Sequence, residues 1–384
     1  MAGSAYARQA LLPEGFRDGL APEAEQEAAL VRGLMDAFLS HGYDRVAPPL
    51  VEYEDSLLVG AGQTRAKQMF RLMDPDTQRM MAVRADMTIQ MARLASTRLA
   101  DAPRPLRLAY TGNVLRTKGS QLRPTRQFIQ AGVELVGSSS LEAELEVIAV
   151  AVEALVASGI TGVSVDLTVA PLVAMMCDQH KLSGDVRDDV MAALEAKDIG
   201  GLAVVPDANR GVFERLLSAA GPADKANEIL AALQLKGGAG KLVARLCRLS
   251  DMIAERLPDV SLTIDPCESH GFEYKTGIGF ALFARSAEGE LGRGGRYMVS
   301  HPDGHEEEAT GFSVYLDSLL KALPAAEKAD HLFLPFGTKS SDGKELREKG
   351  WRTVQGLEAV ADPVAEAKRL DCSHILLDER VRPV

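Results

Sequence analysis

The sequence lacks the features that mark several classes of protein. Its four cysteines form no CxxC pair, and no histidine lies at zinc-ligand spacing from them, so a zinc site is not expected. No apolar run approaches the roughly 18–20 residues of a membrane helix, and the first residues form no apolar signal core. We therefore expect a cytoplasmic protein in a reducing compartment, with buried free thiols. The cysteines are Cys177, Cys247, Cys267 and Cys372.

The chain also lacks an excess of positive charge. Its 43 Lys and Arg residues are outnumbered by 54 Asp and Glu residues, and the formal net charge is −11. The net negative charge gives no general attraction for phosphate polymers, so we expect no nucleic-acid partner. A local basic face can nevertheless coexist with an acidic total charge. Long internal repeats are absent. A chain of 384 residues suits one large domain with one or two appendages.

Apolar periodicity predicts both helices and strands in the first part of the chain. Residues 22–40 carry apolar side chains at helical spacing behind an acidic first turn, and Gly42 ends this helix. Pro48 and Pro49 exclude a helix at residues 45–52 and favour an extended segment at a sheet edge or a turn. Further helices are predicted at residues 86–99 and 141–156, and strands at residues 80–83, 106–115, 126–135 and 163–168.

The composition changes between about residues 171 and 257. Ala, Leu, Asp, Lys and Glu dominate this part, and glycines separate runs of helix length, so we expect a helical insertion. Strand patterns resume at residues 261–264 and 276–284. A glycine-rich bend is expected at residues 292–297, and an apolar strand leading into a helix at residues 311–323.

After a linker at residues 324–328, strand and helix patterns alternate. They predict a small three-stranded α/β domain with right-handed crossovers. Its strands are expected at residues 331–336, 351–355 and 374–377, and its helices at residues 344–349 and 364–370. The predicted organisation is a large mixed-sheet domain at residues 1–323, with an insertion at about residues 171–257, and a C-terminal domain at residues 325–384.

Several segments stand out in order along the chain, at residues 42–52, 84–88, 115–134, 271–274, 294–297 and 311–317. They resemble segments that occur in the same order in histidyl-tRNA synthetases, which are class II aminoacyl-tRNA synthetases. Together they cover roughly residues 10–323, although the first alone would be weak, because helix–glycine–strand–proline is common. The resemblance implies an α+β fold: a class II synthetase-like antiparallel sheet with flanking helices, a helical insertion and a small C-terminal α/β module. The segments resemble motif 1 (residues 42–52), the histidine-binding RADMT motif (84–88), motif 2 (115–134), two histidine-specific signatures (271–274 and 294–297) and motif 3 (311–317).

The resemblance also implies a pocket for histidine. The acid and threonine of the RADMT motif would hold the ammonium group, with Gln130 close to the ligand. An arginine of motif 2 would face the carboxylate, while Glu134 and Tyr274 would bind the two imidazole nitrogens. Asp86 replaces the glutamate of the family, which keeps the charge but shortens the reach. The six residues are Asp86, Thr88, Arg116, Gln130, Glu134 and Tyr274.

Four of these residues also have a purely structural interpretation. Glu134 at a strand end is commonly solvated or ion-paired, and Thr88 is typical of the first turn of a helix. Tyr274 would fit a core position, and Gln130 would fit a residue that caps a neighbouring backbone group. These interpretations stay open at the level of sequence.

Amino-acid activation demands more than an amino-acid pocket, because a triphosphate usually needs several arginines and a metal ion. Motif 2 of the synthetases continues with an acidic residue and a second arginine, where this chain has Lys118 and Gly119. Ser318 stands in the place of the arginine that ends motif 3, and His270 replaces a further catalytic arginine. Losing one such donor typically costs about 10²–10³ in rate. We therefore expect no enzyme activity, catalytic residue, cofactor or metal ion.

These features together resemble one family, the regulatory subunits of short-form ATP phosphoribosyltransferase, the enzyme that opens histidine biosynthesis. That family resembles histidyl-tRNA synthetase, lacks its anticodon-binding domain and pairs with a separate catalytic subunit. The resemblance implies a dimer formed through the motif 1 region, and L-histidine as an allosteric effector. Bound histidine would bias the assembly toward a less active arrangement, which gives feedback inhibition of the catalytic subunit.

Other functions stay open at this level. The chain could be a divergent active histidyl-tRNA synthetase, or a paralogue that transfers an amino acid to something other than tRNA. Both would need an ATP site, against which the losses at positions 270 and 318 argue. A third alternative is a structural scaffold with an empty pocket, which would give no heat on titration with L-histidine.

Overall fold

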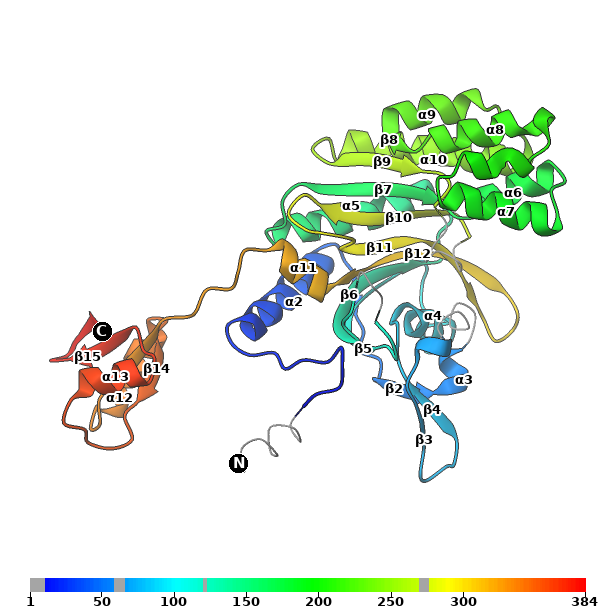
Figure 1. Ribbon diagram of the computed structural model, residues 1–384. Coiled ribbons are helices and arrows are strands. Elements are labelled where there is room, and N and C mark those ends of the chain that lie inside the picture. The colour runs from blue at the N-terminus through cyan, green and yellow to red at the C-terminus, as the bar shows by residue number, and fades with distance from the viewer. Residues whose placement is uncertain (1–10, 59–65, 120–122, 269–275) are drawn as a thin grey trace. The chain divides into compact units, whose positions relative to one another are not determined.

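A computed structural model gives the fold and describes residues 11–58, 66–119, 123–268 and 276–384 (Figure 1). Its contacts divide the chain into two compact units. One unit contains residues 27–324 and the segment that ends at Asp18, and the other contains residues 325–384 with residues 19–26. Within the described residues, no helix is both long and apolar enough to cross a membrane.

A nine-stranded sheet forms the centre of the first unit. Its neighbouring strands are antiparallel except for two parallel pairs, β1 with β5 and β7 with β9. The position of β1 at one edge agrees with the prolines that follow it. In order across the sheet, the strands are β1 (Asp44–Arg45), β5 (Leu106–Leu115), β6 (Gln127–Val136), β12 (Glu306–Tyr315), β11 (Gly292–Ser300), β10 (Ile278–Ala284), β7 (Val163–Val169), β9 (Ser261–Asp265) and β8 (Gly221–Pro222).

The first face of this sheet carries the larger apolar core. Helices α2 (Glu23–Ser40) and α5 (Leu141–Ala157) pack side chains such as Phe38 and Val147 against strand residues such as Val133. Helix α11 (Leu316–Ala322), which continues directly from β12, also contributes to this core. Burial of this apolar surface is the main driving force that holds helices to a sheet.

The second face of the sheet carries α4 (Thr88–Ser96), which packs Met91 against the sheet core that contains Tyr110 and Tyr297. A small antiparallel sheet and one further helix precede α4 along the chain. The strand order of this sheet is β2 (Val51–Tyr53), β4 (Met80–Val83) and β3 (Arg71–Met73), and the helix is α3 (Glu54–Leu57). Strand β4 leads through residues 84–87 into α4, and this connection carries part of the site.

The predicted helical insertion is present between β7 and β9. Figure 1 shows its helices gathered at the end of the sheet formed by β7, β9 and β8. The two-residue strand β8, which pairs with β9, was not predicted. The helices are α6 (Leu172–Gln179), α7 (Gly184–Glu195), η2 (Gly200–Val204), α8 (Asp207–Ser218), α9 (Ala223–Ala232) and α10 (Gly237–Arg256).

The prediction of a glycine-rich bend at residues 292–297 was wrong, because this segment is part of strand β11. Gly294 lies against the ring of Phe280 on β10. A Cβ atom at Gly294 would be 2.2 Å from Cζ of Phe280 and 2.5 Å from the carbonyl oxygen of Gly311 on β12. Glycine is therefore needed here for close approach between neighbouring strands, and not for a turn.

The second unit contains a four-stranded sheet rather than the predicted three strands. The chain reverses at Asp378 and Glu379, which both have positive φ angles, and returns as an antiparallel strand. The fourth strand was not predicted, because this tight turn lacks the Asn-Gly or Asp-Gly pair that is typical of two-residue hairpins. The strand order is β14 (Arg352–Gln355), β13 (His331–Leu334), β15 (His374–Leu377) and β16 (Arg380–Pro383), and the helices are α12 (Ser340–Glu348) and α13 (Pro363–Arg369).

All four cysteines are free thiols. Cys177, Cys267 and Cys372 are buried, as expected, whereas Cys247 on α10 is only partly buried. Burial raises the pKa of the Cys267 thiol to about 12, so this thiol stays protonated and unreactive at neutral pH.

Candidate functional site

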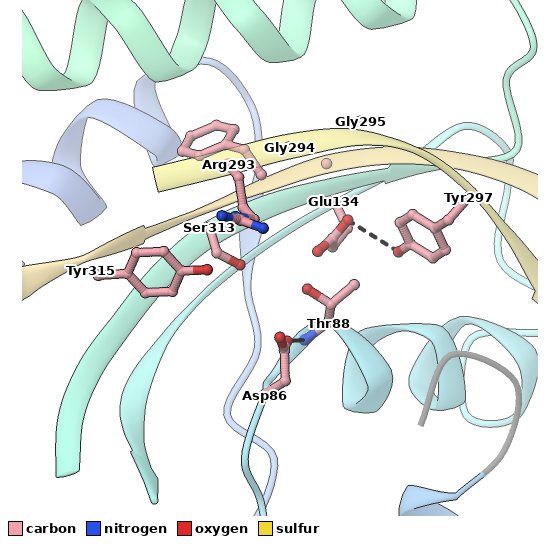
Figure 2. Close-up of a pocket in the computed structure, with 11 residues that line it drawn as sticks. Asp86, Thr88, Glu134, Arg293, Gly294, Gly295, Tyr297, Ser313 and Tyr315 are labelled. Carbon is pink, nitrogen blue, oxygen red and sulfur yellow. Dashed lines mark hydrogen bonds between the residues drawn. The ribbon is translucent and has the colours of Figure 1, made fainter. Parts of the chain in front are cut away.

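A small pocket lies between the start of α4 and the second face of the central sheet (Figure 2). It is narrow, and the space that a water-sized sphere can occupy in it is about 10 Å³. The carboxyl groups of Asp86 and Glu134 face each other across it, and hydroxyl groups surround them. We call it the carboxylate pocket; among the residues that line it are Asp86, Thr88, Glu134, Tyr297, Ser313 and Tyr315.

The strands place these side chains through their two-residue alternation. Gln130 and Glu134 are four residues apart on β6 and therefore point to the same face. On β12, Gly311, Ser313 and Tyr315 share that face, and Gly311 lies opposite Glu134 in the strand register. The pocket wall thus follows from two adjacent antiparallel strands.

Asp86 and Thr88 reach the pocket from the connection between β4 and α4. The backbone N–H of Thr88 donates to Oδ1 of Asp86 at 2.9 Å. Gln130 on β6 fixes the same turn, since its Oε1 accepts from the N–H of Met87 at 3.0 Å and its Nε2 donates to Oδ1 of Asp86 at 3.3 Å. The helix predicted at residues 86–99 accordingly begins only at Thr88.

Glu134 is the most deeply buried acid of the pocket, with 1% of its surface exposed. Tyr297 donates a hydrogen bond to its Oε2 at 3.0 Å, and Tyr110 donates to its Oε1 at 3.2 Å. Burial raises the pKa of Glu134 to about 8; the charge of Asp86 raises it as well, while hydrogen bonds from Thr88, Tyr297 and Tyr110 act in the opposite direction. At neutral pH this carboxyl is therefore mostly protonated.

Two glycines make room for these groups. A Cβ atom at Gly311 would lie 1.7 Å from Oε2 of Glu134, and one at Gly132 would lie 2.7 Å from the hydroxyl of Tyr110. That hydroxyl reaches across Gly132 to Oγ of Ser313 at 2.8 Å. Glycine at these two positions therefore permits the hydrogen-bonded group around Glu134 to form.

Four of the six predicted residues meet in this way: Asp86, Thr88, Gln130 and Glu134. The structural interpretations hold for two of them as well, because Thr88 begins a helix and Gln130 caps the N–H of Met87. Glu134 is neither solvated nor at the surface. Tyr274, like His270, lies outside the described residues.

Among the residues of this site that were not singled out from the sequence are Tyr110, Tyr297, Ser313 and Tyr315. Tyr297 ends the glycine-rich signature at residues 294–297, and Ser313 lies inside motif 3, so each was within a recognised segment. Tyr110 is on β5 opposite Gly132. Nothing in the sequence of β5 distinguishes it from an ordinary core tyrosine.

The remaining predicted residue, Arg116, lines a second and larger hollow, in which a water-sized sphere can occupy about 320 Å³. Its Nε lies 3.5 Å from the carbonyl oxygen of Ala85, next to Asp86 in the chain. We call this second space the basic hollow, because its lining includes Lys67, Arg116, Lys118 and Arg123.

A stacked pair forms the wall between the two spaces. The guanidinium of Arg123 lies 3.7 Å from the centre of the Tyr315 ring, which lines the carboxylate pocket. Arg123 also donates to Oγ of Ser318 at 3.2 Å and pairs with Asp317, with 3.6 Å between Nε and Oδ2. Ser318, in the place of the ATP-contacting arginine of the synthetases, is thus a partner of Arg123.

The arrangement favours a small ligand rich in N–H donors. Two buried carboxyl groups surrounded by hydroxyls can each bind an ammonium or an imidazole N–H. In the part of the chain that the structure describes, no three His, Cys, Asp or Glu side chains come together to hold a metal ion.

Comparisons with known proteins agree with this geometry. The model of the histidyl-tRNA synthetase family matches residues 15–319. The ATP phosphoribosyltransferase regulatory subunit of Paramagnetospirillum magneticum is 49% identical over 370 residues, which are 96% of this chain and 97% of that protein.

Solved structures show the same fold at lower identity. An ATP phosphoribosyltransferase regulatory subunit/histidyl-tRNA synthetase from Bacillus halodurans has a TM-score of 0.79 and 24% identity, over 94% of this chain and 96% of that one. A chain of the ATP phosphoribosyl transferase (HisG:HisZ) complex from Thermotoga maritima has a TM-score of 0.59 and 19% identity, over 76% of this chain and 97% of that one. The predicted class II synthetase-like α+β fold is confirmed.

Proposed function

This chain belongs to the family of ATP phosphoribosyltransferase regulatory subunits, and we propose that it senses L-histidine in the carboxylate pocket. As in that family, it is a regulatory subunit of the enzyme of histidine biosynthesis and not a catalytic one. Histidine is the end product of the pathway that this enzyme opens, which makes it the natural effector for feedback.

The pair of buried acids, Asp86 and Glu134, carries the proposal. L-histidine has two groups that can bear positive charge, its ammonium and its imidazole. Asp86, with Thr88 and Gln130, would hold the ammonium, and Glu134 would accept from the imidazole. A ligand N–H close to Glu134 lowers the pKa of its carboxyl, so histidine would enter together with ionisation of a group that burial otherwise keeps neutral.

The two remaining predicted residues complete the proposed site. Arg116 would meet the ligand carboxylate from the side of the basic hollow, where its contact with Ala85 places it beside the turn that carries Asp86. Tyr274 would bind the second imidazole nitrogen. A carboxylate and a hydroxyl on the two ring nitrogens would distinguish histidine from other amino acids.

We also propose the assembly in which this sensor acts. The partner is the catalytic subunit of ATP phosphoribosyltransferase, and the T. maritima structure is a complex of that enzyme. The chain would dimerise through residues 42–52, where Pro48 and Pro49 line an apolar groove together with Tyr53 and Leu94. Residues 1–323 would form the sensing domain with its insertion at about residues 171–257, and residues 325–384 a separate C-terminal domain.

Calorimetric titration of the full chain with L-histidine tests the proposed pocket. Wild type should bind saturably, and Glu134→Gln, which keeps the shape but cannot ionise when the ligand binds, should weaken binding by about 10²-fold. The matched control is Glu228→Gln, which changes an exposed acid on α9, in the helical segment between β7 and β9. It should leave the affinity unchanged. Absence of saturable heat with wild type would favour an empty scaffold. Histidine-dependent exchange of pyrophosphate into ATP would instead establish a synthetase.

A further inference from the structure

Arg293 on β11 is a cation in the carboxylate pocket, where the proposed histidine site leaves it without a role. It is one of the residues that line the pocket. Strand alternation turns its side chain to the same face as Gly295 and Tyr297, and in the strand register it lies opposite Ser313 on β12. Figure 2 shows its guanidinium group beside Ser313. The pocket therefore holds a positive charge as well as its two carboxyl groups.

An ion pair fixes this guanidinium group. Nε of Arg293 donates to Oε1 of Glu290 at 2.8 Å, and Nη2 donates to Oε2 of the same carboxylate. Only 25% of the Arg293 side chain and 18% of the Glu290 side chain are exposed. Because the pair is bidentate, it sets the plane of the guanidinium group as well as its position. A guanidinium group has five N–H donors in a rigid fork, so it can bind a second carboxylate at another edge.

Hydrogen bonds connect the neighbour of Arg293 with the place proposed for the ligand ammonium. Nε2 of Gln130 donates to Oγ of Ser313 at 2.6 Å and to Oδ1 of Asp86 at 3.3 Å. Figure 2 shows Arg293 and Asp86 entering the pocket from opposite sides, one from the sheet and the other from the connection to α4. An α-amino acid carries its ammonium and its carboxylate on one carbon atom, so its site needs a cation close to an anion. Arg293 and Asp86 provide both in one narrow space.

We propose that Arg293 binds the carboxylate of the ligand and thereby selects a free amino acid over an amine such as histamine. This inference rests on the proposed histidine site. It adds a cation inside the pocket to Arg116, which would approach the same carboxylate from the basic hollow. Asp86 would hold the ammonium, Arg293 the carboxylate and Glu134 the imidazole, so each polar group of L-histidine would meet a complementary group.

Calorimetric titration of the full chain with L-histidine and with histamine tests this inference. Arg293→Gln should weaken L-histidine binding by about tenfold, because the carboxylate loses a charged donor that is partly exposed. The same variant should bind histamine within about twofold of wild type, since histamine has no carboxylate that could lose its partner. Arg293→Lys, which keeps the charge but not the fork, should fall between Arg293→Gln and wild type in its affinity for L-histidine.

The matched control is Arg285→Gln, which changes an exposed arginine in the turn after β10 and should leave both affinities unchanged. Equal weakening of both ligands by Arg293→Gln would overturn the inference, because it would indicate a purely structural role for the pair with Glu290. Unchanged L-histidine binding would overturn it as well. Glu134→Gln should weaken both ligands, because both carry an imidazole. If wild type binds no L-histidine, the proposed site fails together with this inference. If Glu134→Gln behaves as expected and Arg293→Gln does not, this inference fails alone.

Discussion

The carboxylate pocket and the basic hollow share the wall formed by Tyr315 and Arg123, yet they are built in opposite ways. The pocket is buried and acidic, and hydrogen bonds between strands fix its groups. The hollow is open and basic, and two of its four charges are on exposed lysines. The pocket belongs to the packed sheet, whereas the hollow is formed largely by connecting segments.

We relate this difference to the parts of a synthetase-like site that the chain would retain. Groups on central strands cannot change without disturbing the core, which supports the proposal that a pocket for an amino acid persists with its glycines. Triphosphate chemistry depends on single arginines that face open space, and replacing them costs little stability. At position 318, a serine now accepts a hydrogen bond from Arg123.

Among the substitutions, the largest expected effect on stability concerns the packing of the pocket. Gly311→Ala should lower the free energy of unfolding by about 3 kcal/mol, because the new methyl group would lie 2.5 Å from the carbonyl oxygen of Val133 and even closer to Glu134. Gly211→Ala on the exposed side of α8 has open space around it and should raise stability by about 0.5–1 kcal/mol. Urea denaturation measures both. Equal stability of the two variants would refute the close packing described at Gly311.

The next largest expected effect concerns the affinity for ligands that lack one charged group of L-histidine. The ammonium would lie in the carboxylate pocket, and the carboxylate would face the basic hollow. Imidazolepropionate, which is histidine without its amino group, should bind about 10²-fold more weakly than L-histidine, because the buried Asp86 then has no cation. Histamine, which lacks only the carboxylate, should bind about tenfold more weakly than L-histidine. This loss is smaller because Arg116, the proposed partner of the carboxylate, is partly exposed. The reverse order in calorimetry would show that the pocket selects the anionic end of its ligand.

The sequence predicted the elements of the fold better than the details of the site. Strand β5 has the predicted bounds, and β6 differs by one residue at each end, because their apolar alternation is strong. Residues 292–297 were predicted as a bend but belong to strand β11, because glycine occurs where strands pack closely as well as in turns. Tyr110 could not be found, because its role depends on Gly132 and Ser313 in two other strands, a contact that no local pattern records.

Between about pH 4.5 and pH 8, Glu134 should make the stability of the folded chain fall as pH rises. Its pKa is about 8 in the folded chain and near 4.5 when exposed, so between these values the folded state holds a proton that the unfolded state has lost. The contribution of this proton to the free energy of unfolding is fully present below about pH 4.5 and is lost by about pH 8. The free energy falls by no more than about 1.4 kcal/mol per pH unit between these values. Thermal unfolding from pH 5 to 8 should show a shallower decline in Glu134→Gln. Parallel curves for the two proteins would contradict the buried neutral carboxyl.

The smallest expected effect concerns one hydroxyl. Tyr297→Phe removes the hydrogen bond to Oε2 of Glu134 and should weaken L-histidine binding by about fivefold to tenfold, since the carboxylate form loses one donor. Tyr53→Phe, on the small sheet, should leave the affinity unchanged. An effect of equal size in both variants would indicate a general loss of stability instead of a contact at the pocket.

The most direct test of a histidine-sensing regulatory subunit is an activity assay with the catalytic subunit of ATP phosphoribosyltransferase. The full chain should co-purify with that subunit and support its activity, and L-histidine should lower the rate several-fold to a hundredfold, as a coupling of about 1–3 kcal/mol allows. With Glu134→Gln, the assembly should form and stay active when histidine is added. A chain that neither binds the catalytic subunit nor changes its rate, or a Glu134→Gln assembly as sensitive to histidine as wild type, would contradict the proposed sensor.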